Sequence, residues 1–312
     1  MEKRVVITVG DPAGIGPEVV SESVNSLSLE FPSCEFLIVG DEVLLNNSGL
    51  KKNSNVSIKQ TGELNLSTFQ RGKVSSSGGK LSLGYIEEAL KLIDKDTPLI
   101  TAPISKEAIN LAGAKWSGHT ELLADYFAVE HPVMMMVGEN IKVSLVTRHI
   151  PLIKVSGELS KGLIVHTIDL TYKVLKDGFK IGFPRIGICG LNPHAGESGL
   201  LGKEEDGIII PAIEVIKKKS IEVSGPFPAD TAFIKLKEKH LDALVAMYHD
   251  QALIPFKLLD FHDGVNLTLG LPVIRTSPAH GTAMDIVQQK GKIDPGSMKA
   301  AIRLAIKLSF DD

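Results

Sequence analysis

Residues 4–18 read RVVITVGDPAGIGPE, a β-branched run followed by a glycine-rich turn. The β-branched run predicts a buried strand, the glycines permit a tight turn, and Pro17 is typical of a helix start. The turn lacks the third glycine of a dinucleotide fingerprint and the Gly-Lys-Ser/Thr ending of a phosphate loop. The stretch therefore predicts a strand, turn and helix unit that is not a Rossmann dinucleotide motif.

The same alternation of short apolar runs and amphipathic segments continues along the chain. Further strands are expected at 35–39, 97–102, 142–146, 185–189 and 243–246. Helices are expected at 85–92, 106–111, 121–127, 207–217 and 298–306, and a surface loop at 72–79. Such alternation indicates βαβ units in a mostly parallel sheet that is covered on both faces, which is a doubly wound α/β architecture.

Length and composition narrow the class of protein. A chain of 312 residues exceeds the usual size of a single core, so two domains are expected. A net charge of -3 argues against a nucleic-acid partner. Cys34 and Cys189 have no paired spacing, so neither a disulfide framework nor a thiolate zinc site is expected. With no secretory signal pattern and no long apolar run, we expect a cytoplasmic protein without a membrane partner.

Three histidines follow predicted strands directly: His149, His194 and His249. Ligands bind beyond the carboxyl ends of parallel strands, and neutral imidazoles are common metal ligands. Three protein ligands with open positions are typical of a catalytic metal site. Glu197 and Asp250 are candidate carboxylate partners of two of these rings. Each histidine taken alone also fits a structural role.

Two further groups could hold an anion. Thr120 is a candidate N-cap of the helix that begins near residue 121, and the amides there, with His119, could hold a phosphate or carboxylate. An ordinary capped helix is the alternative. Lys257, Asn266 and Arg275 would make a clamp for a phosphorylated substrate. Solvated surface cations are the alternative for these.

Taken together, several stretches resemble the 4-hydroxythreonine-4-phosphate dehydrogenase family, the NAD(P)-dependent enzymes of pyridoxal phosphate synthesis. The matching stretches are 10–18, 101–106, 118–121, 191–197, 225–231, 246–251 and 266–285, in the family's order. The resemblance implies two α/β/α domains around a central cleft, as in isocitrate and isopropylmalate dehydrogenases. Residues 1–125 with 270–312 would form the cofactor-side domain, and 126–269 the domain with the metal ligands and the dimer interface. A homodimer is implied, with residues of both subunits in each active site.

The resemblance also implies roles for individual residues. A divalent metal ion, which could be zinc, cobalt or magnesium, would be bound by His149, His194 and His249. The substrate would be contacted by His119, Thr120, Lys257, Asn266 and Arg275. The NAD or NADP cofactor would be bound by a loop containing His280, Gly281, Thr282 and Asp285.

The implied reaction is oxidation of the C3 hydroxyl of 4-phosphooxy-L-threonine, followed by decarboxylation to 3-amino-2-oxopropyl phosphate, in pyridoxine 5'-phosphate biosynthesis. A metal ion would act as a Lewis acid in both steps. Asp230 and Asp250 are hypothesised to orient the substrate ammonium or relay protons, and Lys257 to share that relay.

The sequence departs from the family pattern in three places. Ala279 stands before His280 where the family usually has an acidic residue, and residues 285–291 replace a stretch that usually contains Ala-Gly. These two departures leave the choice between NAD and NADP open. Ala252 stands where Gly is common, and none of the three departures changes a proposed metal ligand.

Three alternatives remain from the sequence. A paralogous dehydrogenase of the same fold would act on 4-phospho-D-threonate or phosphoerythronate. A non-enzymatic small-molecule sensor would not need metal, phosphate and dinucleotide elements together. A metallohydrolase would use three histidines and a carboxylate to activate water, but it would leave the loop at His280 unexplained.

Overall fold

The computed structural model describes residues 3–65, 69–289 and 292–310. The chain divides into two compact units: unit 1 is Met1–Pro132 with Leu271–Asp312, and unit 2 is Val133–Gly270. The sequence had placed the boundaries after residues 125 and 269. Lys290 and Gly291, at the end of the variant stretch 285–291, lie outside the described residues.

Unit 1 is built on a parallel sheet with β1 near its centre. In spatial order, its strands are β3 (Val56–Gln60), β2 (Cys34–Gly40), β1 (Lys3–Thr8), β4 (Leu99–Thr101) and β11 (Arg275–Pro278). β1 is buried over Val5–Thr8, because helices cover both faces of the sheet. The predicted strand at residues 4–9 is therefore confirmed.

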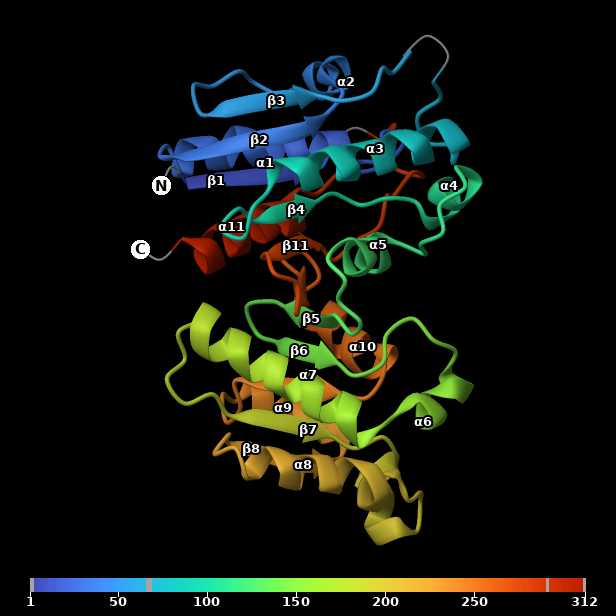
Figure 1. The fold of residues 1–312 in the computed structure, drawn as a ribbon, viewed down its shortest axis with the longest axis vertical. Coiled ribbons are helices and arrows are strands. Elements are labelled where there is room, and N and C mark those ends of the chain that lie inside the picture. Colours follow the sequence, from blue (N-terminus) through green and yellow to red (C-terminus); the bar gives the residue numbers. More distant parts are fainter. Residues whose placement is uncertain (1–2, 66–68, 290–291, 311–312) are drawn as a thin grey trace. The chain divides into compact units, whose positions relative to one another are not determined.

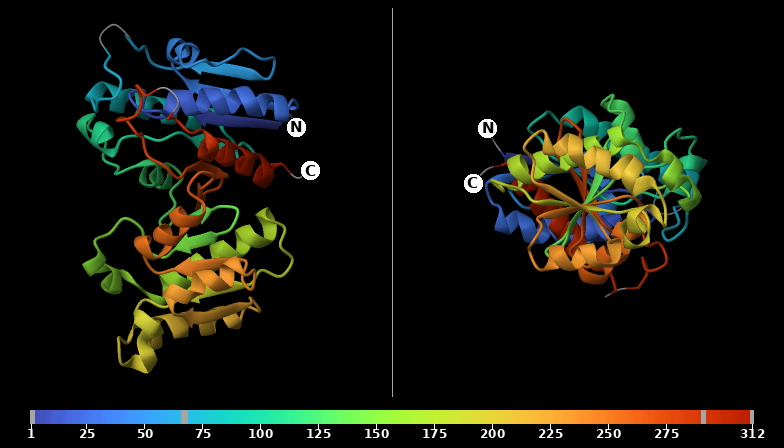
Figure 2. Two further views of the ribbon diagram at one scale, coloured as in Figure 1. Left: turned by 180° about the vertical axis from the view of Figure 1, so that it is seen from behind. Right: turned by 90° about the horizontal axis from the view of Figure 1, so that it is seen from below.

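Helices cover the sheet of unit 1 in two layers (Figures 1 and 2). One face carries α1 (Gly16–Glu30) and α11 (Gly296–Ser309), and α3 (Ser76–Leu92) packs on the other. Pro17 lies in the first turn of α1, as predicted. The shorter helices are α2 (Glu42–Asn47), α4 (Lys106–Leu111) and α5 (His119–Tyr126).

Unit 2 has a mixed sheet. In spatial order, its strands are β10 (Val265–Leu269), β5 (Val133–Val137), β6 (Lys142–Leu145), β9 (Ala243–Ala246), β7 (Ile186–Cys189) and β8 (Val223–Phe227). The pairs that β5 makes with β10 and β6 are antiparallel. β6, β9, β7 and β8 run parallel to one another. Their carboxyl ends therefore lie at one edge of this sheet.

Helices again form a layer on each face of unit 2. α7 (Lys161–Lys173) and α8 (Ile210–Lys217) cover one face, and α9 (Ala229–Lys237) and α10 (His249–Leu259) cover the other (Figures 1 and 2). Short elements complete the unit: η1 (Leu152–Lys154), α6 (Val155–Glu158), η2 (Val174–Gly178), η3 (Pro193–Gly199) and η4 (Glu205–Ile209). Both units are thus α/β/α layers, as expected. None of the helices in the described part of the chain combines the length and apolar character of a membrane span.

The glycine-rich segment 72–79 differs from its prediction as a surface loop. Residues 76–79 form the first turn of α3, with the Ser75 hydroxyl accepting a hydrogen bond from the Gly78 amide at 3.1 Å. A Cβ at Gly79 would lie 2.0 Å from the carbonyl oxygen of Ala108. The small residues are therefore required for close packing of α3 on α4, which a local pattern of serines and glycines does not reveal.

Asp260 holds the turn between β5 and β6. Its carboxylate accepts hydrogen bonds from the Ile141 amide at 2.9 Å and from the Asn140 side chain at 2.7 Å. Asp260 is only 5% exposed, so water cannot readily replace these bonds. A Cβ at Gly138 would lie 2.3 Å from the carboxylate, so the glycine leaves the space that Asp260 occupies.

We predict that Asp260→Ala lowers the free energy of unfolding of unit 2 by about 3 kcal/mol, because it leaves buried amides without an acceptor. Chemical denaturation followed by circular dichroism measures this. Asp263→Ala, at an exposed position three residues further on, is the matched control and should change stability by less than about 0.5 kcal/mol. Equal stability of the two variants would contradict the prediction.

Candidate active site

The three predicted histidine ligands emerge from adjacent parallel strands of unit 2. His149 follows β6, His194 follows β7 and His249 begins α10 after β9. Because β9 pairs with both β6 and β7, the three loops leave the same edge of this sheet. This is the edge at which α/β proteins bind their ligands.

Two of these histidines lie together. The ring centroids of His149 and His249 are 5.4 Å apart. Among the residues that the structure describes, no group of three or more His, Cys, Asp or Glu side chains is close enough to hold a metal ion. One copy of the chain therefore brings His149 and His249 together, and within its described residues the three histidines do not form a ready-made metal-binding group.

The histidine and carboxylate contacts expected from the sequence are present. Nδ1 of His249 lies 2.6 Å from Oδ1 of Asp250, and Nδ1 of His194 lies 2.9 Å from Oε2 of Glu197. In metal sites, a carboxylate commonly holds one ring nitrogen and so directs the other toward the metal. The donor chemistry of these residues thus fits a divalent metal ion at the Nε2 atoms.

The other predicted residues of unit 2 are more dispersed. Asn266 lies in β10, and its Oδ1 atom is buried with no hydrogen-bond partner in the described structure. Lys257 is exposed on α10, and Asp230 is exposed in the first turn of α9. Asn266 is therefore the member of this group whose surroundings leave a buried polar atom for a ligand to satisfy.

In unit 1, the buried Arg275 lies close enough to the half-buried His119 for its charge to act on that ring. Arg275 is 2% exposed, and its guanidinium donates a hydrogen bond to the Thr101 hydroxyl at 2.6 Å. Burial lowers the pKa of Arg275 to about 10, although the nearby Glu121 carboxylate opposes the shift. The guanidinium therefore stays positively charged at neutral pH in a poorly hydrated environment.

His119 is neutral beside this charge. Burial, and then the positive charge of Arg275, hold the pKa of His119 well below 6.5. Its Nε2 atom is buried and makes no hydrogen bond in the described structure. A guanidinium and an unsatisfied imidazole nitrogen are together suited to an anionic oxygen ligand.

The expected cap of α5 is wrong. Gly118 occupies the N-cap position, and no side chain caps the helix. Thr120 lies inside the first turn instead, one residue after His119. The helix therefore begins at His119, earlier than expected, with its first amides uncapped by any side chain.

The predicted cofactor loop rests on the first turn of the chain. The Ile15 amide donates to the Thr282 carbonyl at 2.9 Å, and a Cβ at Gly14 would lie 2.6 Å from that same oxygen. Nδ1 of His280 lies 3.0 Å from the Gly281 carbonyl, while its Nε2 is buried with no hydrogen-bond partner in the described structure. Asp285 is exposed in the same loop. The unsatisfied ring nitrogen leaves a donor or acceptor for a ligand such as a dinucleotide.

Sequence reasoning missed Arg71, which braces this turn. Its guanidinium forms an ion pair with Glu18 and also donates to the carbonyls of Pro12 and Gly14. The contact joins residues 53 positions apart, so local spacing gives no signal for it.

Sequence reasoning also missed Gln251. Its side chain accepts from the Met247 amide and donates to the Gly190 carbonyl, both at 2.7 Å. It therefore ties the loop before His249 to the loop that leads to His194.

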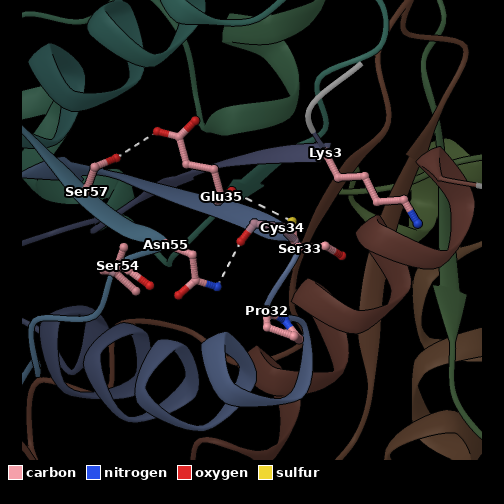
Figure 3. A pocket seen from close by; sticks show the side chains of 9 residues that line it. Lys3, Pro32, Ser33, Cys34, Glu35, Ser54, Asn55 and Ser57 are labelled. Carbon is pink, nitrogen blue, oxygen red and sulfur yellow. Dashed lines mark hydrogen bonds between the residues drawn. The ribbon is translucent and has the colours of Figure 1, made fainter.

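A separate recess of about 290 Å³ lies at the amino ends of β1, β2 and β3 (Figure 3). Its polar groups are already engaged: the Asn55 amide donates to the Cys34 carbonyl at 3.0 Å, and Ser57 donates to Glu35 at 3.0 Å. None of the predicted site residues is among its lining residues. The recess lies at the opposite ends of the strands from the turn that carries the cofactor loop.

Comparisons with known proteins bear on the family of the chain. A family model described as pyridoxal phosphate biosynthetic protein PdxA matches residues 31–305. A curated relative from Desulforapulum autotrophicum, named 4-hydroxythreonine-4-phosphate dehydrogenase, is 43% identical over 96% of this chain and 93% of its own.

Solved structures give the same result. The crystal structure of 4-hydroxythreonine-4-phosphate dehydrogenase from Klebsiella pneumoniae matches with a TM-score of 0.84 and 36% identity, covering 99% of this chain and 98% of that one. Isocitrate dehydrogenase from Methylococcus capsulatus shares the fold alone, with a TM-score of 0.53 and 13% identity over 98% of this chain and 85% of that one. The predicted fold class is confirmed. This chain is an oxidoreductase and belongs to the family described as pyridoxal phosphate biosynthetic protein PdxA.

Proposed function

We propose that this enzyme oxidises the C3 hydroxyl of 4-phosphooxy-L-threonine with NAD or NADP, and that the product loses carbon dioxide to give 3-amino-2-oxopropyl phosphate. The reaction would belong to pyridoxine 5'-phosphate biosynthesis in the cytoplasm. The names of the relatives support this substrate. The observation that carries the proposal is the buried Arg275 guanidinium near the buried Nε2 atom of His119.

This pair fits the phosphate or carboxylate of the substrate. Arg275 is buried near the Glu121 carboxylate, and its planar guanidinium could also donate hydrogen bonds to an incoming phosphate oxygen. The neutral His119 can donate a further bond through Nε2 without adding charge. Thr120, Asn266 and Lys257 would supply the remaining contacts with the substrate.

Metal binding is assigned to His149, His194 and His249. Carboxylates hold the rings of His194 and His249, and three imidazoles fit a zinc, cobalt or magnesium ion by donor chemistry. When bound, such an ion supplies Lewis-acid stabilisation of negative charge on substrate oxygens. Asp250 holds the His249 ring, and we propose that it also relays protons together with Asp230 and Lys257.

A second copy of the chain would complete this site. His194 is exposed, and within the described residues of one chain the three histidines do not form a metal-binding group, so we propose that a further chain completes the ligand set. Large apolar side chains are exposed on α10 and just beyond it, with Ile254 68%, Leu258 82% and Phe261 59% accessible. Apolar surface beside site residues supports a homodimer whose subunits share their active sites.

The cofactor is assigned to the loop containing His280, Gly281, Thr282 and Asp285. Its backbone is supported by the turn at Gly14, and the buried Nε2 of His280 is open to a hydrogen bond. The proposal covers both NAD and NADP, because no ion pair of this loop in the described structure favours one cofactor over the other.

The first test measures NAD(P)H formation at 340 nm with 4-phosphooxy-L-threonine and added divalent metal. We expect metal-dependent turnover, reduced at least about 100-fold in His194→Ala, because loss of Lewis-acid stabilisation removes several kcal/mol from the transition state. His240→Ala, at another exposed histidine of unit 2, is the matched control and should retain activity. Turnover of 4-phospho-D-threonate alone would assign the paralogous reaction instead, and turnover of neither substrate would reject the proposal.

The second test replaces Arg275 by Lys, which keeps the charge but loses the planar set of donors. We expect the KM for the phosphorylated substrate and the Ki for inorganic phosphate to rise about 10- to 100-fold, as loss of a charged hydrogen bond predicts. Arg303→Lys, at an exposed ion pair with Glu30, should leave both constants unchanged. A folded Arg275→Lys variant with ordinary constants would show that the anion binds elsewhere.

A further inference from the structure

The loop that carries His194 has an unusual backbone. Residues 194–198 all have left-handed dihedral angles, with φ of 52° at His194, 54° at Ala195, 83° at Gly196, 45° at Glu197 and 56° at Ser198. L-residues with a Cβ adopt this conformation only at a cost in free energy, and seldom as a run. Contacts outside the turn must therefore hold it, and such strain is common at functional sites.

Glu205, at the start of η4, supplies these contacts. One carboxylate oxygen accepts from the amides of Leu191 and Asn192, both at 2.8 Å, and the other accepts from the Asn192 side chain at 2.9 Å. Glu205 is only 3% exposed. These hydrogen-bond partners all belong to the segment that leads into the turn.

Two glycines make room for this carboxylate. A Cβ at Gly190 would lie 3.1 Å from one Glu205 oxygen, and a Cβ at Gly196 would lie 2.6 Å from the other. Gly196 is itself the central residue of the left-handed run. The turn is thus wrapped closely around the Glu205 side chain.

The contacts form a continuous path to the histidine. Glu205 fixes Asn192, whose carbonyl accepts the Ala195 amide at 3.1 Å and so closes the first part of the turn. The turn then places Glu197 beside Nδ1 of His194 at 2.9 Å. A shift of Asn192 would therefore also displace the His194 imidazole.

We propose that Glu205 is a positioning residue, which holds the left-handed turn so that Nε2 of His194 is presented to a metal ion. The inference rests on the metal site of the proposed function. Glu205 itself does not need to touch the metal or the substrate, because its oxygens are occupied by the backbone and by Asn192.

The test uses Glu205→Gln and Gly196→Ala in the metal-free, full-length protein. The glutamine loses the charge and turns one acceptor into a donor facing the Asn192 amide. In Gly196→Ala, the added methyl group would press on the Glu205 carboxylate from within the turn. This variant therefore tests the contact between Glu205 and the turn even if Glu205→Gln folds poorly. Glu214→Gln, at an exposed glutamate of α8, is the matched control.

Hydrogen exchange is the first measurement. We expect exchange of the amides in residues 190–201 to accelerate at least tenfold in both test variants, with other segments and the control unchanged. Unchanged exchange in these amides would overturn the proposal, whether or not the protein binds metal.

Cobalt(II) binding is the second measurement, followed by visible absorption and calorimetry at a temperature where circular dichroism shows every variant folded. We expect the Kd for Co²⁺ to rise about 10- to 100-fold in the test variants, the usual effect of removing a residue that orients a ligand. A lower unfolding temperature with unchanged Kd would show a merely structural role and overturn the inference. Absence of Co²⁺ binding by the unaltered protein would instead reject the metal site of the proposed function.

Discussion

Where a buried parallel strand ends, the chain turns away and its amide N–H groups find no carbonyl acceptor on a neighbouring strand. Burial of such groups without partners is costly. This constraint shapes both units. Asp11 is fully buried after β1 and accepts the Ala13 amide at 2.9 Å. Glu205 and Gln251 do the same after β7 and β9. Acidic and amide side chains at these strand ends therefore have a structural role that does not depend on a ligand.

The same groups determine where the candidate site residues can lie. Gln251 joins the loops that carry His194 and His249, so neither loop can shift without breaking a buried bond. In unit 1, burial raises the pKa of Asp11, while the amides of Ala13 and Ser105 oppose that shift. Asp11 thereby links the first turn to Ser105, the residue that caps α4. Stability and ligand placement consequently depend on one set of contacts.

Local pattern was sufficient for much of the fold. The strand at residues 4–9 and the helix start at Pro17 follow from side-chain shape and backbone geometry, which act over a few residues. The pairing of His249 with Asp250 is also local. Contacts between distant positions were not accessible: Asp260 meets Asn140 across 120 residues, and Arg71 meets Glu18 across 53. The first turn of α3 was missed because Gly79 is required by its close approach to the Ala108 backbone, which is distant in sequence.

The proposed anion site and the proposed metal site differ in how well a single chain orders their side chains. Arg275 and the Nε2 atom of His119 are buried within their own unit, so an anion would meet groups whose side-chain freedom is already restricted. His194 is exposed, and a rotating surface imidazole would lose entropy on binding a metal ion. A left-handed turn pinned by a buried carboxylate reduces that loss, because the backbone that carries the ring has few conformations left. The backbone strain in residues 194–198 is thus the free-energy cost of holding the His194 imidazole in place before a metal ion binds.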